Sequence, residues 1–348
     1  MRSMRILNDE VVKSILDIKS TVECVEKAYS LKAKQQARLF SMISEEIIEG
    51  KAEMDIKSGM LDGDNVFGLK LVSWFGDNTK QGLPAITGLT MIFDLVHGFP
   101  KGVLNASYMT GMRTGAAGAL GIKYLARSNS SVLSVVGTGR MAIFQIAATL
   151  SVMPGIKKVH IYDPLNYENA KKFQDGIKKE LGKIINDLND QDNQLWLRRI
   201  DEVLFVATDD PQKMLMDSDA VITITPSRTP LLKKAWIKPG THLSCIGADV
   251  AGKQEIDENI FKEAVVCVDD RQQAVTVGET QCAFRANIIE SSDLIEIGHL
   301  IIGESEGRRS DQDITIFDST GISLQDLAVS NGLILKAEEL NLGELVQI

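Results

Sequence analysis

The sequence predicts an α/β protein of two domains. Residues 132–136 form a short apolar segment of the buried-strand type, and a glycine-rich turn and an apolar helix follow it at once. Further short apolar segments come after it with helical or polar stretches between them, which is typical of parallel βαβ units. The length of 348 residues exceeds that of an average domain and favours a second one.

Composition and charge exclude several classes of protein. Hydrophobic residues make up 44% and charged residues 24% of the chain, as in ordinary globular proteins, and the formal net charge of −9 argues against broad nucleic-acid binding. No run of 18 apolar residues and no apolar signal segment occurs, so neither membrane insertion nor secretion is expected. The cysteines are widely spaced, which favours reduced thiols in a cytoplasmic protein. They are Cys24, Cys245, Cys267 and Cys282.

The first part of the chain predicts a mixed domain over residues 1–127. Residues 1–30 have helical periodicity, with Asn8 or Asp9 as the cap. Glycines then separate short apolar segments such as 66–74 and 86–93, which predicts strands and turns. An alanine- and glycine-rich helix is predicted over residues 110–127.

The second part predicts a domain of alternating strands and helices over residues 128–312. A charged helix is expected at 168–188 and a polar loop at 189–194. A strand and turn at 314–321 lead into a helix at 324–335, and segment 313–348 is expected to return to the first domain. The other predicted strands are 132–136, 159–162, 220–225, 242–246 and 264–268.

The glycine-rich turn matches a dinucleotide-binding pattern. Gly137 permits a tight turn, Gly139 allows the backbone to approach a pyrophosphate, and Ala142 keeps the following helix close to the strand. The helix N-terminus adds N–H donors and a positive dipole. The alternative is an ordinary α/β turn that binds nothing.

Asp163 supports the nucleotide interpretation. It stands 26 positions after Gly137 (163 − 137), at the end of the second predicted strand. An acid at this place accepts hydrogen bonds from ribose hydroxyls and repels a 2′-phosphate, which favours NAD over NADP. The alternative is that Asp163 only caps a helix.

Two basic residues stand in apolar or glycine-rich surroundings. Arg113 lies between Gly111 and Gly115, and its guanidinium is suited to hold a carboxylate by two parallel bonds. Lys70 lies in a predicted strand and is a second anchor, or a proton donor if burial lowers its pKa. The alternative is a pair of surface or salt-bridged cations. No metal site is expected, because the histidines lack metal-ligand spacing, and Ser227 lies in no nucleophile motif.

Taken together, several segments resemble the ornithine cyclodeaminase/mu-crystallin family and, within it, archaeal-type alanine dehydrogenases. The resemblance implies a Rossmann NAD-binding domain and an α+β substrate-binding and dimerisation domain, with the C-terminal helix packed on the latter. It also implies a homodimer that uses NAD on a small amino, imino or oxo acid. The segments are 110–127, 137–142, 222–230, 240–257, 268–279 and 306–329.

The resemblance also implies roles for individual residues. It assigns the substrate carboxylate to Arg38, Lys70 and Arg113, with Lys70 or a water near it exchanging the proton. The implied nucleotide contacts are Arg113, Gly137, Thr138, Gly139, Arg140, Met141, Asp163, Thr225, Ser227 and Ser319.

Departures from the family pattern bear on the reaction. Cyclodeaminases carry an aspartate where this chain has Ser227, and a serine cannot act as an ionised general base. Pro84-Ala85 replaces a frequent Pro-Thr pair, and Glu53 and Asp55 are candidates to hold a distal amine. The expected function is therefore an NAD-dependent oxidoreductase at the C–N bond of a small 2-amino acid. The alternatives are an ornithine or lysine cyclodeaminase with catalytic NAD, and a nucleotide-binding or storage protein of the mu-crystallin type.

Overall fold

The computed structural model describes residues 3–185 and 190–348, and the chain divides into two compact units. Unit 1 comprises Met1–Arg113 and Ile322–Ile348, and unit 2 comprises Thr114–Gly321. The breaks therefore fall after residues 113 and 321, whereas the sequence predicted them after 127 and 312.

The first break lies inside a helix, α3 (Ser107–Leu125). Side chains of unit 2 hold its later part. The Gln145 amide donates a hydrogen bond of 2.8 Å to the Thr114 carbonyl, and the Arg308 guanidinium donates one of 2.7 Å to the Leu125 carbonyl. The helix therefore changes units before the sequence pattern changes.

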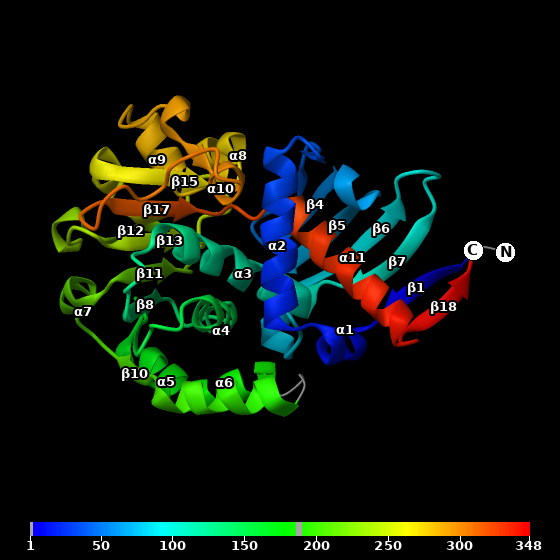
Figure 1. Ribbon diagram of the computed structural model, residues 1–348, viewed down its shortest axis with the longest axis horizontal. Coiled ribbons are helices and arrows are strands. Elements are labelled where there is room, and N and C mark those ends of the chain that lie inside the picture. Colours follow the sequence, from blue (N-terminus) through cyan, green and yellow to red (C-terminus); the bar gives the residue numbers. More distant parts are fainter. Residues whose placement is uncertain (1–2, 186–189) are drawn as a thin grey trace. The chain divides into compact units, whose positions relative to one another are not determined.

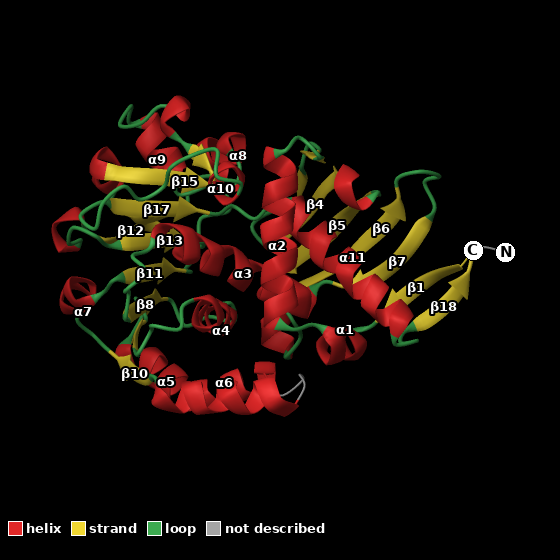
Figure 2. Ribbon diagram, in the orientation of Figure 1, coloured by secondary structure: helices red, strands yellow, loops and turns green. Residues whose placement is uncertain are grey.

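Unit 1 is built on one mixed sheet with helices on one face (Figure 1). Figure 2 shows its strands in yellow beneath these helices. The elements, besides the start of α3 and short 3-10 turns at Asp62–Asp64 and Gly76–Gln81, are β1 (Ser3–Leu7), α1 (Asp9–Ile15), α2 (Ile18–Ala33), β2 (Ala37–Leu39), β3 (Ile43–Ile48), β4 (Ala52–Leu61), β5 (Val66–Phe75), β6 (Ile86–Asp94), β7 (Pro100–Asn105), α11 (Ser323–Glu339) and β18 (Glu344–Gln347).

The strand order in unit 1 is β18-β1-β7-β6-β5-β4-β2, and β3 also pairs with β4. Neighbours are antiparallel except β1 and β7. β5 and β6 confirm the predicted strands at 66–74 and 86–93. The helix predicted at 324–335 is α11, which packs across β4, β5 and β6 beside α2 (Figure 1).

The single helix predicted over residues 1–30 is wrong. The chain forms β1 first and then two helices, because Leu16 is extended (φ −86°, ψ 119°) and interrupts the helical backbone. Asn8 caps α1, and Asp17 starts α2 by accepting a hydrogen bond of 2.7 Å from the Ser20 N–H. The two N-caps, Asn8 and Asp17, therefore divide into two helices a segment for which periodicity alone predicts one.

Unit 2 is a parallel sheet, as the α/β prediction requires. α-Helices connect its strands except from β11 to β13 and from β13 to β15, where short strands and 3-10 turns stand instead. Its elements, besides the end of α3 and 3-10 turns at Lys234–Trp236, Glu258–Glu263 and Ser291–Asp293, are β8 (Val132–Val136), α4 (Ala142–Val152), β9 (Lys158–Tyr162), α5 (Tyr167–Ile185), α6 (Asp190–Glu202), β10 (Leu204–Ala207), α7 (Pro211–Asp217), β11 (Ala220–Thr223), β12 (Arg228–Leu232), β13 (His242–Cys245), β14 (Gln254–Ile256), β15 (Ala264–Val268), α8 (Arg271–Val277), α9 (Thr280–Arg285), β16 (Ile295–Glu296), α10 (Ile297–Ile301) and β17 (Ile314–Asp318).

The strand order is β10-β9-β8-β11-β13-β17-β15-β16, and β12 pairs with β14 in a separate parallel pair. The order reverses at β8, from which the chain proceeds first to one side and then to the other. In open parallel sheets the ligand lies at the carboxyl ends of the strands beside such a reversal. Leu243, Val266 and Ile316 lie in the buried core of this sheet.

One helix of unit 2, α6, stands where the prediction places a polar loop. The charged helix expected at 168–188 is α5, which ends at Ile185. Positions 186–188 of this prediction and residue 189 lie outside the described part of the chain. The polar loop expected at 189–194 is wrong from residue 190 onward, because α6 begins there. Within residues 3–185 and 190–348, no helix is both long and apolar enough to span a membrane.

Candidate functional site

The turn between β8 and α4 has the geometry of a dinucleotide-binding loop. Gly137 has a φ of +107°, and a Cβ there would lie 2.7 Å from the Ile224 carbonyl oxygen, so no side chain fits. A Cβ on Gly139 would meet no atom within 4 Å, so its backbone borders open space. α4 begins at Ala142, and its first N–H groups have no acceptor within the helix. The loop therefore fits a phosphate group at the helix N-terminus.

Asp163 follows β9 and lies beside this loop. Its carboxylate accepts hydrogen bonds from the Thr138 hydroxyl, from the Leu165 N–H at 3.0 Å and from the Asn169 amide at 3.3 Å. Burial acts to raise the pKa of Asp163, but these hydrogen bonds outweigh it and the pKa is lowered. Asp163 is thus an oriented anion, which fits a ribose and disfavours a 2′-phosphate.

A cavity of about 870 Å³ lies along the loop and the strand ends of unit 2. Residues that follow β8, β9 and β11 line it, so it occupies the reversal point of the sheet. This volume, the glycine loop and the aspartate together fit a dinucleotide. The predicted nucleotide contacts that line the cavity are Gly137, Thr138, Gly139, Arg140, Asp163, Thr225 and Ser227.

The other predicted nucleotide contacts do not belong to the described lining. Met141 is the residue before α4. Ser319 is buried, and its hydroxyl donates a hydrogen bond of 3.1 Å to Asp269. Arg113 belongs to unit 1, where other residues bind its side chain.

The cavity wall after β11 is fixed by bonds within the protein. The Thr225 N–H and hydroxyl both donate to Oε1 of Glu255, at 2.6 and 2.7 Å. The Ser227 hydroxyl donates a bond of 2.6 Å to the Thr229 carbonyl. The position that carries an aspartate in cyclodeaminases therefore holds a hydroxyl that is already bonded to the main chain.

Lys70 and Arg113 meet at one carboxylate in unit 1, that of Asp326 in α11. Lys70 Nζ lies 2.9 Å and Arg113 Nε lies 3.0 Å from its Oδ1. Arg113 Nη1 also donates a bond of 2.7 Å to Gln325, whose amide donates one of 2.5 Å to the Tyr29 hydroxyl. Lys70 is 3%, Arg113 6% and Asp326 0% exposed, which excludes surface cations. The ion pairs of both cations with Asp326 match the other half of the alternative, a pair of salt-bridged cations.

The two cations and the anion perturb one another. Burial lowers the pKa of Lys70 to about 7, and the Arg113 charge adds to this while Asp326 opposes it. Burial acts to raise the pKa of Asp326, but the Arg113 and Lys70 charges outweigh it and that pKa is lowered. With Lys70 protonated, the cluster has an excess positive charge, and near pH 7 Lys70 can transfer a proton.

Two buried oxygens at this cluster have no hydrogen-bond partner among the described residues: Oδ2 of Asp326 and Oγ1 of Thr90. Thr90 pairs with Lys70 across β5 and β6, so both side chains lie on the same face of the sheet. Buried polar atoms are normally satisfied, so unsatisfied ones indicate room for a polar ligand or water. Excess positive charge beside them fits a small carboxylate.

Arg38 does not join this cluster. It pairs with Met60 of β4, whereas Lys57 of the same strand pairs with Lys70. Residues 57 and 60 are three positions apart, so their side chains point to opposite faces of the sheet. Arg38 is exposed, and its guanidinium lies 5.4 Å from the centre of the Phe40 ring.

Glu53 and Asp55 lie on the same sheet face as Lys57, because all three are at alternating positions of β4. Asp55 pairs with Val72, two residues along β5 from Lys70. An acid therefore follows the cationic cluster along the strands.

Sequence reasoning did not identify the acids that hold these sites. Asp326 and Glu255 both lie in segments that were interpreted only as part of a family pattern. The available signal was the presence of polar residues in the apolar part of a helix: α11 carries Gln325, Asp326, Ser330 and Asn331 between apolar residues, and all four are buried. Such residues inside a buried helix require partners.

The fold and the cavity define a dinucleotide-binding protein, whose other unit contains a buried cluster of Lys70, Arg113 and Asp326. The chain belongs to the ornithine cyclodeaminase/mu-crystallin family, whose model matches residues 3–194 and 183–339.

Several relatives are known proteins. The chain is 35% identical over 343 residues to the alanine dehydrogenase of Archaeoglobus fulgidus, covering 98% of each chain. A solved archaeal alanine dehydrogenase dimer with bound NAD is 34% identical, covers 100% of each chain and has a TM-score of 0.88. The iminosuccinate reductase of Paracoccus denitrificans in complex with NAD⁺ is 28% identical, with 100% coverage of each chain and a TM-score of 0.89.

A third solved relative carries both kinds of ligand. The Delta(1)-pyrroline-2-carboxylate reductase of Thermococcus litoralis, in complex with NADH and L-proline, is 25% identical. It covers 98% of this chain and 99% of its own, with a TM-score of 0.86.

Proposed function

We propose that the chain is an NAD-dependent oxidoreductase that acts on the C–N bond of a small 2-amino acid. The observation that carries this proposal is the buried pair Lys70 and Arg113, which share the single carboxylate of Asp326 and so have spare positive charge for a ligand carboxylate. The unsatisfied Thr90 hydroxyl can donate to that carboxylate, and Oδ2 of Asp326 can accept from a ligand nitrogen. Three relatives are named for alanine, iminosuccinate and pyrroline-2-carboxylate, and each of these compounds has a carboxylate next to the reacting carbon. Bound NADH supplies a hydride to C2 of a 2-imino acid or cyclic ketimine, and NAD⁺ accepts it in the reverse direction.

Each residue of the cluster has a defined part in this reaction. Arg113 and Lys70 hold the carboxylate, and the Nη2 edge of Arg113 is not used by Asp326 or Gln325. Reduction of C=N requires one proton on nitrogen in addition to the hydride on carbon. Lys70, with a pKa of about 7, supplies that proton directly or through a water and recovers it from solvent.

The cavity of unit 2 is the proposed NAD site. The pyrophosphate lies on the loop from Gly137 to Arg140, and Asp163 accepts the ribose hydroxyls. Replacing Asp163 by Ser removes the anion that repels a 2′-phosphate. We expect the preference for NADH over NADPH, measured as a ratio of kcat/KM, to fall at least about tenfold. An unchanged ratio would remove Asp163 from the assignment.

The direct experiment is a substrate panel followed at 340 nm. The protein is incubated with NADH, ammonia and a series of 2-oxo acids, and separately with NADH and cyclic imines. Steady loss of NADH supports the proposal, and the substrates that react define the side chain. No reaction with any member of the panel, in a protein that binds NADH, would overturn it.

Cyclodeamination of ornithine or lysine is the second candidate. One observation favours it: Asp55 lies on the same sheet face as Lys70 and is placed to meet a distal amine. Against it, Ser227 replaces the aspartate base and is bonded to the main chain. Ammonia released from ornithine with no net change in NADH would establish this reaction instead.

We also propose a homodimer formed through the sheet face of unit 1 opposite α11. Ile43, Ile56, Leu71 and Leu89 pair in a row across β3, β4, β5 and β6, and Ile43, Leu71 and Leu89 are 49%, 37% and 50% exposed. An apolar row of this kind favours burial against a second copy, and the solved archaeal alanine dehydrogenase is a dimer. Light scattering tests this proposal. We expect the wild type to have twice the mass of one chain and Leu71→Asp to be a monomer. A monomeric wild type would contradict the proposal.

The proposed location is the cytoplasm, because the four cysteines are free thiols, as in a reducing compartment.

A further inference from the structure

Unit 2 contains three buried carboxylates that are linked through backbone N–H groups. Asp318 accepts a hydrogen bond of 3.1 Å from the Glu279 N–H, and Glu279 accepts one of 2.9 Å from the Glu255 N–H. Glu255 in turn accepts the Thr225 N–H at 2.6 Å. We call Asp318, Glu279 and Glu255 the carboxylate chain. It connects the end of β17 with the wall of the cavity.

Glu255 binds two loops with one carboxyl group. Its Oε1 accepts the N–H and hydroxyl of Thr225, which lines the cavity. Its Oε2 accepts the Thr223 hydroxyl at 2.7 Å and the Gly247 N–H at 2.9 Å. The loops after β11 and β13 are therefore fixed relative to each other by a single side chain.

The carboxylate chain is held without cations. Every hydrogen bond that its carboxylates accept from the described residues comes from a backbone N–H or a threonine hydroxyl. The exposures of Glu255, Glu279 and Asp318 are 0%, 1% and 0%. Three buried acids without a counter-ion are costly to retain, so a role beyond packing is expected.

Two glycines make room for these carboxylates. A Cβ on Gly247 would lie 2.6 Å from Oε2 of Glu255, and a Cβ on Gly278 would lie 2.4 Å from Oδ2 of Asp318. Real Cβ atoms do not approach other atoms so closely. The absence of a side chain at Gly247 and Gly278 therefore leaves the space that Glu255 and Asp318 occupy.

We propose that Glu255 is a positioning residue for the cofactor: it fixes the cavity wall at residues 224–227, and Glu279 and Asp318 fix Glu255 from behind. This inference rests on the proposed function, because it takes the cavity to be the NAD site. The effect is transmitted through Thr225 and Gly247, and Glu255 itself does not belong to the described lining of the cavity.

The test replaces Glu255 by Gln. Glutamine keeps the length and one acceptor oxygen but turns an NH₂ group toward two of the four donors that Glu255 now accepts. We expect the Kd of NADH, measured by its fluorescence, to rise about tenfold. In the free protein, hydrogen–deuterium exchange at 223–227 and 245–248 is expected to become faster. Thr223→Val, which removes one of these bonds at a residue outside the described lining of the cavity, is the milder second variant.

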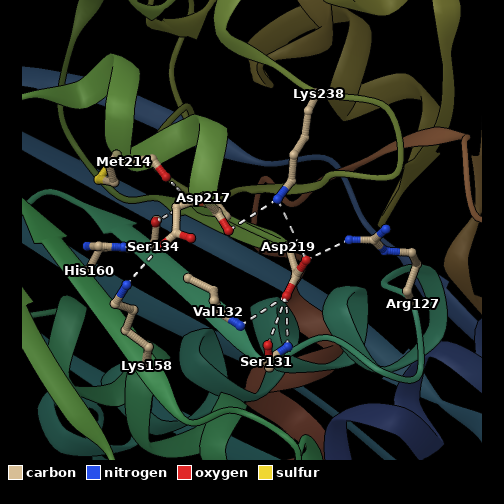
Figure 3. A network of polar contacts seen from close by, with 11 residues as sticks. Arg127, Ser131, Val132, Ser134, Lys158, His160, Met214, Asp217, Asp219 and Lys238 are labelled. Atoms are coloured by element: carbon tan, nitrogen blue, oxygen red, sulfur yellow. Dashed lines mark hydrogen bonds and ion pairs between the residues drawn. The ribbon is translucent and has the colours of Figure 1, made fainter.

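Asp219 offers a matched control in the same unit. It accepts the Ser131 and Val132 N–H groups at 2.8 and 3.1 Å and pairs with Arg127 at 2.6 Å, at the amino ends of the strands (Figure 3). Asp219→Asn removes a comparable backbone acceptor at the end opposite to the glycine loop. We expect it to lower stability but to leave the NADH Kd within about twofold.

The outcomes separate this inference from the proposed function. An unchanged NADH Kd together with unchanged exchange at 223–227 in Glu255→Gln overturns the inference, and so does an equal rise in Kd for Asp219→Asn. If Glu255→Gln does not fold, Thr223→Val decides by the same two measurements. If the wild type does not bind NADH, the proposed function fails, and the exchange at 223–227 still decides whether Glu255 fixes the wall.

Discussion

Each unit buries a cluster of ionisable side chains, and the two clusters are satisfied in opposite ways. In unit 1, Lys70 and Arg113 share the Asp326 carboxylate. In unit 2, Glu255 and Glu279 pair with no cation of the described residues and are held by N–H and hydroxyl donors. The first cluster has spare positive charge and unsatisfied oxygens, so it can take an anionic ligand. The second can change its charge only by taking up protons.

The pKa values follow this difference. Opposite charges lower the pKa of Asp326 in spite of its complete burial. Burial without opposite charges raises the pKa of Glu255, of Glu279 and of Asp318, the last to about 7. Under the proposed function, buried charge recognises the ligand in one unit and holds backbone in the other, and each use predicts its own response to mutation and pH.

The largest effect is expected from Arg113→Ala. It removes the bidentate anchor and leaves the Asp326 carboxylate with Lys70 alone, so kcat/KM for the 2-oxo or imino acid should fall roughly 1,000-fold. The Kd of NADH should change little, because the cavity lies in unit 2. Arg113→Lys keeps the charge but loses the planar guanidinium, so its kcat/KM should lie between those of the wild type and Arg113→Ala. Equal losses in substrate and NADH binding would contradict the carboxylate role.

The second-largest effect is expected from Asp326→Asn. It leaves two buried cations without their anion, so the free energy of unfolding in urea should decrease by about 3 kcal/mol. Asp326 acts to raise the pKa of Lys70, so its removal should move that pKa below about 7. The limb of the kcat/KM–pH profile that reports Lys70 should then shift to lower pH. A limb that does not move would show that Lys70 is not the group it reports.

Asp318→Asn should give a smaller effect with a defined pH dependence. Burial raises the folded-state pKa of Asp318 from 3.8 to about 7, so the folded protein binds this proton more tightly than the unfolded chain does. Its contribution to stability is complete below pH 3.8 and is lost as the pH rises through about 7. The variant should therefore lose less stability than the wild type between pH 4.5 and pH 7.5, at most about 1.4 kcal/mol less per pH unit. If the free energy of unfolding in urea changed equally with pH in the variant and the wild type, the raised pKa of Asp318 would be contradicted.

The sequence predicts the parallel sheet and its glycine loop because both depend on local pattern. Strands such as β8 and β15 are marked by apolar runs and following turns, and their bounds agree with the prediction. Gly137 and Asp163 are joined by one βαβ unit, so their distance along the chain limits their distance in space.

Partners far apart in the chain could not be predicted in this way. Lys70 and Asp326 are 256 positions apart, and only the return of α11 to the first unit brings them together. Glu255 is 30 positions from Thr225, on a strand of three residues that shows no periodicity. Where a buried charge finds its partner depends on register and helix packing, which a single sequence does not display.

The smallest effect is expected from Arg38→Ala. This variant tests whether the carboxylate site is confined to the cluster around Asp326. The family resemblance assigns Arg38 to the substrate carboxylate, whereas the β2–β4 register directs its side chain away from Lys70 and over the Phe40 ring. An exposed cation over an aromatic ring contributes only about 0.5–1 kcal/mol, so the KM of the carboxylate substrate should change less than about twofold. Arg113→Ala measured in parallel provides the scale for a true anchor. If Arg38→Ala raised KM as much as Arg113→Ala does, the carboxylate site would include the opposite face of the sheet, and the cluster around Asp326 would be only part of it.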